Sequence, residues 1–217
     1  MVDRGTGGVT GQTNETPLDE KRKQILQAAL KEFARSGYEG ASTNRIIKDA
    51  GVSKGLLFYY FESKKDLYLE TADMCLQYFE LRVGRELTTM SDDIVDRIVE
   101  IGRVKLKTAA EQPLMYRLLS DVFLDPPEDL KEELDALQSR LRIKYLPYLT
   151  ENIDWSRFRD GVDRQKAVGL ITLVVDSIGG QYARAYRDSG YKHSSDLDDA
   201  IHEIQIYLDM LKHGVYK

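Results

Sequence analysis

The chain has few of the residues and motifs on which most chemical sites depend. Cys75 is its only cysteine among 217 residues, so no disulfide forms within the chain. The three histidines, His193, His202 and His213, lack the close spacing of metal ligands. Neither a P-loop nor a G-x-G-x-x-G motif is present. No apolar run approaches the roughly 20 residues of a membrane span, and residues 1–8 lack the apolar core of a secretory signal. We therefore expect a cytoplasmic protein without metal, cofactor or membrane partner.

Charge is distributed unevenly along the chain. The net charge is −5, but residues 17–65 hold ten Lys and Arg against six Asp and Glu, a net charge of +4. Residues 66–217 carry −8. A basic N-terminal segment on an acidic remainder is the charge distribution expected of a DNA-binding head with a separate regulatory part. Random scatter of charge is the alternative.

Apolar residues recur at helical spacing, and no alternating strand pattern of useful length is present. The fold class predicted is all-α, with about nine helices. Prolines at 113, 126, 127 and 147 mark helix starts or breaks, and Pro147 is expected to end or kink its helix. Two long helices, over 162–188 and 195–212, close the chain.

Residues 43–61 predict two short helices joined by a tight turn. Thr43 is the expected N-cap of the first helix. Gly51 is expected to end that helix, because glycine enters the left-handed conformation without a Cβ clash. Ser53 is the expected cap of the second helix. Two helices joined in this way form a helix-turn-helix, whose second helix enters the DNA major groove.

The pattern extends on both sides of this motif. It comprises Ile25, Ala28-Ala29, Phe33, Gly37-Tyr38, Thr43, Ile46-Ile47, Ala50-Gly51-Val52-Ser53-Lys54-Gly55, Tyr59-Tyr60-Phe61 and Lys64-Lys65-Asp66-Leu67. From Ile25 to Leu67 the chain closely resembles the DNA-binding domain of the TetR family of transcriptional regulators. The resemblance does not extend to the remaining two thirds of the chain.

The composition of the first residues and the resemblance together predict a division into three parts. Residues 1–15 form a flexible arm, residues 16–62 the helix-turn-helix DNA-binding domain, and residues 63–217 a ligand-binding and dimerisation domain. The resemblance also implies a regulator, usually a repressor, that binds a palindromic operator as a homodimer. A small-molecule effector in the C-terminal domain then releases the double-stranded DNA.

The second helix of the motif carries the expected base contacts. Lys54 can reach guanine or a phosphate, and Gly55 allows close approach of the backbone to base edges. Phe58 is exposed if Leu57 and Phe61 face the core, and it can contact a thymine methyl where many family members have tyrosine.

Contacts with the DNA backbone are expected from both helices and their flanks. Tyr59 and Tyr60 can donate hydroxyls to phosphates, with core packing as the alternative for Tyr60. By resemblance, further backbone contacts are expected at Thr43, Asn44, Arg45, Ser53 and Lys64. For Lys64 the alternative is a solvated lysine at a helix start.

An effector site is expected among the helices between about residues 75 and 185. Its candidate residues are Phe79, Arg103, Tyr116, Asp121, Phe123, Tyr145, Tyr148, Trp155, Asp176, Ser177, Gln181 and Tyr182. Asp176 either meets a cationic effector or pairs with Arg103 or Arg184 at the dimer seam. The apolar interior favours a hydrophobic or amphipathic effector.

The helix over 162–188 is too apolar to have a single buried stripe. A symmetric seam with a second copy, built from this helix and the last one, would cover it. The alternative is a central helix within a monomer. The expected interface residues are Val174, Ile178, Tyr182, Ile201, Ile204 and Leu208.

No catalytic constellation is recognisable. Cys75 lies among apolar residues without a nearby histidine, so packing is its expected role. We expect no enzyme. An all-α enzyme with a site built from distant residues, or a helical adaptor, remains as the alternative. A DNA-shift assay at varied salt discriminates between them, because only a regulator gives a sequence-dependent complex with a steep salt slope.

Overall fold

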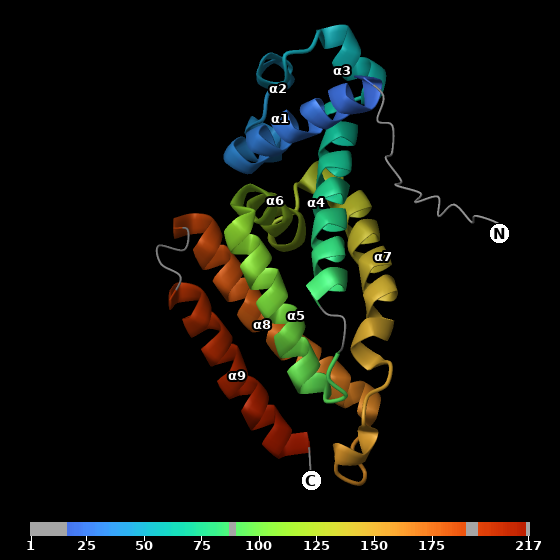
Figure 1. The fold of residues 1–217 in the computed structure, drawn as a ribbon, viewed down its shortest axis with the longest axis vertical. Helices are drawn as coiled ribbons and strands as arrows, with labels where there is room; N and C mark the ends of the chain where they lie inside the picture. Colours follow the sequence, from blue (N-terminus) through green and yellow to red (C-terminus); the bar gives the residue numbers. More distant parts are fainter. Residues whose placement is uncertain (1–16, 87–89, 190–194, 216–217) are drawn as a thin grey trace, which may run out of the picture.

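The computed structural model describes residues 17–86, 90–189 and 195–215, which form nine α-helices, two short 3-10 helices and no strand (Figure 1). The all-α prediction is confirmed. The helices are α1 (Pro17–Gly40), α2 (Thr43–Ala50), α3 (Lys54–Tyr60), α4 (Lys64–Glu86), α5 (Ile94–Glu111), α6 (Pro113–Leu124), η1 (Glu128–Leu130), α7 (Lys131–Thr150), η2 (Trp155–Arg157), α8 (Arg164–Ser189) and α9 (Ser195–Val215). The predicted N-terminal arm, residues 1–15, lies outside the described residues.

The helix ends expected at Thr43 and Pro147 differ from those in the structure. Ser42, not Thr43, occupies the N-cap position of α2, and its side chain makes no capping hydrogen bond. Helix α7 continues past Pro147 to Thr150, so this proline does not end it. At Gly37 the backbone is non-helical, with φ of 65°, so α1 is kinked there rather than ended.

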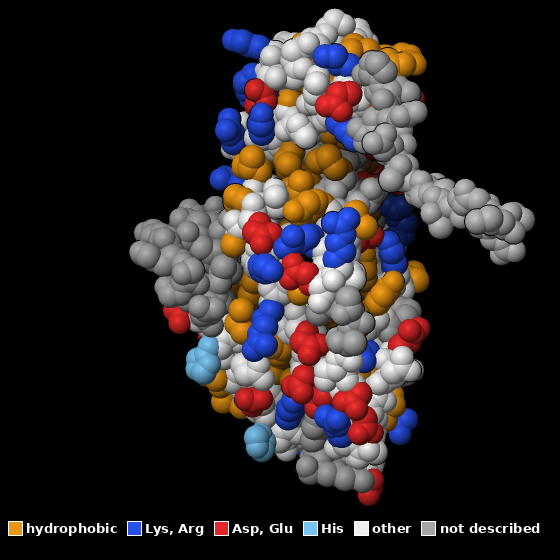
Figure 2. Space-filling model, in the orientation of Figure 1, with side chains coloured by type: hydrophobic (Ala, Val, Ile, Leu, Met, Phe, Trp, Pro, Cys, Tyr) orange, Lys and Arg blue, Asp and Glu red, His pale blue; other side chains and the backbone are white. Residues whose placement is uncertain are grey.

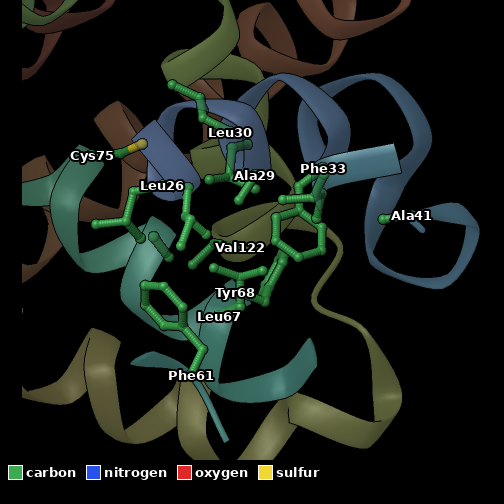
Figure 3. Close-up of a cluster of buried hydrophobic side chains, with 14 of the residues drawn as sticks. Leu26, Ala29, Leu30, Phe33, Ala41, Phe61, Leu67, Tyr68, Cys75 and Val122 are labelled. Carbon is green, nitrogen blue, oxygen red and sulfur yellow. The ribbon is translucent and has the colours of Figure 1, made fainter. Parts of the chain in front are cut away.

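One apolar core joins the head (residues 17–62) to the body (residues 63–217). Figure 3 shows side chains of α1, including Leu26 and Phe33, packed with Phe61, Tyr68 and Val122. The same cluster includes Leu130, Leu134 and Leu137 at the start of α7. Helix α6 contacts α1, α4 and α8, and therefore lies between the head and the long helices of the body. Because one apolar core spans head and body, the predicted boundary between them does not separate two cores. The division into a DNA-binding and a ligand-binding domain remains a proposal about function.

A second apolar cluster lies in the body, away from the head. It is formed by α5, α8 and α9, which run side by side in Figure 1, and includes Ile94, Ile171 and Leu208. The buried Arg97 fastens α5 to the end of α7 by donating to the carbonyls of Tyr148 and Glu151 at 3.0 and 2.6 Å. Backbone carbonyls therefore satisfy a buried guanidinium that would otherwise be costly.

Among the described helices, none combines the length and apolar character that a membrane crossing requires. Within the same residues, no group of three or more His, Cys, Asp or Glu side chains is arranged to hold a metal ion. Cys75 is a buried free thiol, and burial raises its pKa to about 12.

Candidate nucleic-acid interface

The turn between α2 and α3 has the geometry expected of a helix-turn-helix. Gly51 ends α2 in the left-handed conformation, with φ of 62°, and the Val52 N–H donates to the carbonyl of Ile47 at 3.2 Å. The Ser53 hydroxyl caps α3 by accepting from the Leu56 N–H at 3.2 Å. The roles predicted for Gly51 and Ser53 in the turn are confirmed.

Helix α3 buries one face and exposes the other. Leu57 and Phe61 are both 0% exposed within the core that joins head and body. Lys54 and Phe58 lie on the outer side, with the Lys54 ammonium 5.9 Å from the Phe58 ring centroid. Tyr59 is 73% exposed, which leaves its hydroxyl accessible. The outer face of α3 therefore carries one cation and two aromatic rings at the end of the molecule.

Gly55 also lies on this outer face. A Cβ at this position would meet only the Ser53 hydroxyl oxygen, 4.0 Å away. The backbone there is helical, so neither φ nor packing within the protein requires a glycine. The smallest side chain leaves the backbone open to close approach from outside.

The Tyr60 hydroxyl has an internal partner. It donates to the carbonyl of Leu18 at 2.7 Å and ties the end of α3 to the start of α1. A hydroxyl has one proton to donate, so in this conformation Tyr60 has none left for a phosphate. The Tyr60 ring is half-buried against the core that joins head and body.

The expected backbone contacts differ in how they are placed. Lys64 donates to the carbonyl of Glu39 at 3.1 Å, and its ammonium lies 4.8 Å from the centroid of the Tyr38 ring. It is therefore a docked side chain rather than a solvated one. Asn44 and Arg45, on the first turn of α2, are exposed, and Thr43 beside them is half-buried. The Arg45 guanidinium pairs with Glu32 of α1.

Basic side chains are exposed at this end of the molecule. In Figure 2, Lys and Arg project from the head at the top of the view, whereas acidic side chains gather toward the lower body. This agrees with the charges of the two sequence segments. A surface with this polarity attracts the phosphate backbone to the end that presents α3.

The expected effector residues do not come together in one place. Phe79 of α4 is partly buried, and Tyr116, Asp121 and Tyr145 are half-buried on α6 and α7. Trp155 lies instead at η2, beside a cavity of about 250 Å³ that Arg159 and Arg164 also line. Five candidates are exposed: Arg103, Phe123, Tyr148, Ser177 and Gln181. The hydroxyl of a sixth, Tyr182, donates to Glu203 of α9. The side chain of Asp176 lies outside the described set.

The expected dimer residues divide between two faces of α8 and α9. Leu208 is 0% exposed in its own protomer, so it cannot contact a partner, and Ile204 packs against the same core. Val174, Ile178 and Ile201 are half-buried. The predicted interface did not include the apolar side chains that these two helices expose. These are Leu170 and Leu173 on α8, and Ile206, Tyr207 and Met210 on α9. Their i, i+3 and i, i+4 spacing was the available signal.

Comparison with known proteins gives a consistent result. Residues 25–71 match the family described as bacterial regulatory proteins, tetR family. The HTH-type transcriptional repressor AcnR of Corynebacterium jeikeium is 26% identical over 185 residues, covering 85% of this chain and 93% of the relative. The fatty acid metabolism regulator protein of Bacillus subtilis is 26% identical over 169 residues, which cover 72% of this chain and 80% of the relative. The fatty acid degradation regulator FadR of Bacillus halodurans shares the fold, with a TM-score of 0.66, 18% identity, and coverage of 89% of this chain and 98% of that one.

Proposed function

Because this chain is a transcriptional regulator of the TetR family, we propose that it represses transcription by binding a palindromic operator as a homodimer. The observation that supports this best is the division of α3. Leu57 and Phe61 anchor its inner face in the core, while Lys54, Phe58 and Tyr59 project outward from the end of the molecule. A rigid helix held in this way can enter a major groove without rearranging the protein. The relatives are regulators rather than enzymes, so the chain needs no catalysis to act.

The second copy is proposed to pair along α8 and α9. Leu173 and Met210 are 66% and 64% exposed, and Leu170, Ile206 and Tyr207 extend the same apolar surface. These two helices pack against each other, so a twofold axis beside them generates a four-helix seam. Two heads placed by such an axis contact two half-sites about one helical turn of DNA apart.

An effector is proposed to enter the body near Phe79, Tyr116, Asp121 and Tyr145, on the three helices α4, α6 and α7. Helix α6 contacts α1 and α4 as well as α8, so a shift of α6 moves the head. The effector must bind the DNA-incompetent arrangement better, because equal affinity for both states shifts nothing. Half-sites at fixed spacing tolerate little change in the distance between heads, so a small tilt is enough for release.

The effector is proposed to be hydrophobic or amphipathic, and the protein to act in the cytoplasm. Two of the proteins compared above are named for fatty acid metabolism or degradation. A ligand screen by thermal shift should therefore include fatty acids and acyl-coenzyme A thioesters alongside unrelated lipophilic cations. A ligand present at 100 times its dissociation constant adds about 2.7 kcal/mol to the free energy of unfolding.

The test of the function is selection of DNA by the purified full-length protein. A random duplex pool is enriched over several rounds, and the selected duplex is assayed by gel shift from low to high salt. The proposal expects a palindromic sequence, a tight complex and a steep salt slope. A protein that enriches no sequence would contradict the proposal and favour the helical adaptor.

A further inference from the structure

Glu32 of α1 and Arg45 of α2 form a closely bonded charged pair in the head. One carboxylate oxygen, Oε1 of Glu32, accepts from Arg45 Nε at 2.8 Å and from Arg45 Nη2 at 2.5 Å. The same oxygen accepts from the Ser42 N–H at 2.9 Å. Nη2 also donates to the carbonyl of Gly40 at 2.7 Å. The guanidinium is therefore fixed from two directions.

The two partners differ in their exposure. The Glu32 side chain is 12% exposed, whereas that of Arg45 is 58% exposed. The hydrogen bond from Arg45 lowers the pKa of Glu32, so the carboxylate stays ionised at neutral pH. The carboxylate is thus the inner part of the pair, and the arginine is the part presented to solvent.

Arg45 occupies a position that helix electrostatics disfavour. It lies on the first turn of α2, where the positive end of the helix dipole repels a cation. No acidic residue is present in that turn, and the Ser42 side chain does not cap the helix. When helix electrostatics disfavour a charged residue and a partner on another helix holds it in place, a functional role is expected at that position.

The geometry leaves a defined part of the guanidinium available. Arginine has five N–H donors, and the contacts with Glu32 and Gly40 use those on Nε and Nη2. No described residue accepts from Nη1. Its two N–H groups therefore remain for an acceptor outside the protein, beside the exposed Asn44.

We propose that Glu32 is a positioning residue for DNA binding, which holds the Arg45 guanidinium so that Nη1 meets a phosphate oxygen of the operator. This inference rests on the function proposed above. Glu32 itself touches no DNA. It removes the rotamer freedom of a long side chain before binding, so less conformational entropy is lost on contact.

A carboxylate beside a phosphate contact can also act in the opposite sense. If Glu32 only neutralised Arg45 and repelled the DNA, its removal would strengthen binding. Positioning predicts weaker binding on removal, provided that Arg45 is present. Without Arg45 there is nothing to position, and removal of the negative charge should then leave affinity unchanged or higher. The sign of the Glu32 effect therefore depends on Arg45.

A double-mutant cycle on full-length protein measures this sign. The variants are Glu32→Ala, Arg45→Ala and the double variant, and the probe is the duplex that the wild-type protein enriches from a random pool. Arg45→Ala should reduce the slope of log K against log salt by about 0.9 for each protomer. Glu32→Ala should weaken binding by about threefold or more with Arg45 present, the lower range of coupling between touching residues. In the Arg45→Ala background it should not weaken binding.

Two further variants complete the design. Asp49→Ala removes an exposed carboxylate that pairs with Lys31 across the same two helices at 3.2 Å, and it should not weaken binding. Arg45→Lys keeps the charge but lacks the planar fork that bonds Glu32 and Gly40 together. It should lose most of what Arg45→Ala loses, and it tests the inference even if Glu32→Ala does not fold.

Equal or tighter binding by Glu32→Ala with Arg45 present, or wild-type binding by Arg45→Lys, would overturn the positioning role and leave the proposed function intact. Failure of the wild-type protein to enrich any duplex would instead contradict the proposed function.

Discussion

The ring of Phe33 on α1 meets the ring of Tyr68 on α4 edge to face, with centroids 4.9 Å apart and planes at 89°. Both side chains are essentially inaccessible to solvent. Tyr38 adds a third ring, 5.1 Å from Tyr68. The first helix of the head is thus fixed to the first helix of the body by close aromatic packing, so movement of α4 is expected to move α1 with it.

Tyr68→Phe should stabilise the protein. The Tyr68 hydroxyl is buried and has no hydrogen-bond partner among the described residues, and desolvation raises the pKa of its phenol. Removing a buried, unsatisfied hydroxyl should add about 1 kcal/mol to the free energy of unfolding, or about 2–4 °C to Tm for a chain of this size. Thermal unfolding measures this, with Tyr38→Phe as the control. A lower Tm for Tyr68→Phe would mean that the hydroxyl has a partner in solution.

Gly55→Ala should separate stability from DNA affinity. A Cβ meets nothing closer than 4.0 Å in the free protein, and alanine favours a helix over glycine by up to about 1 kcal/mol. Tm should therefore stay the same or rise, while affinity for the selected duplex falls because the added methyl group prevents close approach. Both are measured on one preparation. Unchanged affinity would show that α3 does not approach DNA through this residue.

Lys54→Ala should weaken DNA binding without lowering Tm. The side chain is exposed, and its described contact is with the Phe58 ring. Loss of one phosphate or guanine contact on each protomer should be visible in fluorescence anisotropy at physiological salt. Lys166, exposed on α8, gives the matched control. A variant that loses stability but keeps affinity would refute the assignment of Lys54.

Leu173→Asp should dissociate the homodimer. A charge placed at the centre of an apolar seam remains unpaired. Burying it costs several times the free energy that burial of the leucine side chain gains. Light scattering should report a monomer. Ile143→Asp is the control, because Ile143 is 76% exposed on α7, outside the proposed seam. A dimeric Leu173→Asp protein would place the seam elsewhere.

The pairing of Lys65 on α4 with Glu133 on α7 should make stability depend on pH. Lys65 lowers the pKa of Glu133 from its usual 4.5, and Glu133 raises the pKa of Lys65 from 10.5. The stabilisation from Glu133 is therefore present above pH 4.5 and is lost as pH falls through the lowered pKa. That from Lys65 is present below pH 10.5 and is lost as pH rises through the raised pKa.

The difference in Tm between wild type and Glu133→Gln should consequently be widest near neutral pH and shrink toward acid. It should be small, because both side chains are about 40% exposed and solvent screens the pair. Thermal melts at a series of pH values, with Glu132→Gln as the control, measure it. A difference that is constant with pH would show that the pair does not form in solution.

Local features of the head were predictable from sequence because they depend on neighbouring residues. Gly51 and Ser53 act through φ and a capping hydroxyl within four residues, and Leu57 and Phe61 follow helical spacing. The bonds of Arg45 to Glu32 and of Tyr60 to Leu18 depend on how helices cross. They join residues 13 and 42 positions apart, and no periodicity indicates them.

The body was less predictable because its helices have more than one apolar stripe. In α9, Ile204 and Leu208 face the protomer's own core, whereas Ile206, Tyr207 and Met210 face outward. The sequence shows both stripes without indicating which one meets a partner. Tryptophan is a residue type expected at a ligand site, but Trp155 lies on a 3-10 turn beside a cavity that none of the other candidates lines.

The number of chains bound to one enriched duplex tests the central claim most directly. Mass photometry of the complex, with the selected sequence and a scrambled duplex of equal length, supplies that number. We expect chains in multiples of two on the selected duplex, with half-sites related by a twofold axis, and little binding to the scrambled one. A single chain per duplex, or equal binding to both duplexes, would contradict a paired regulator that contacts DNA through α3.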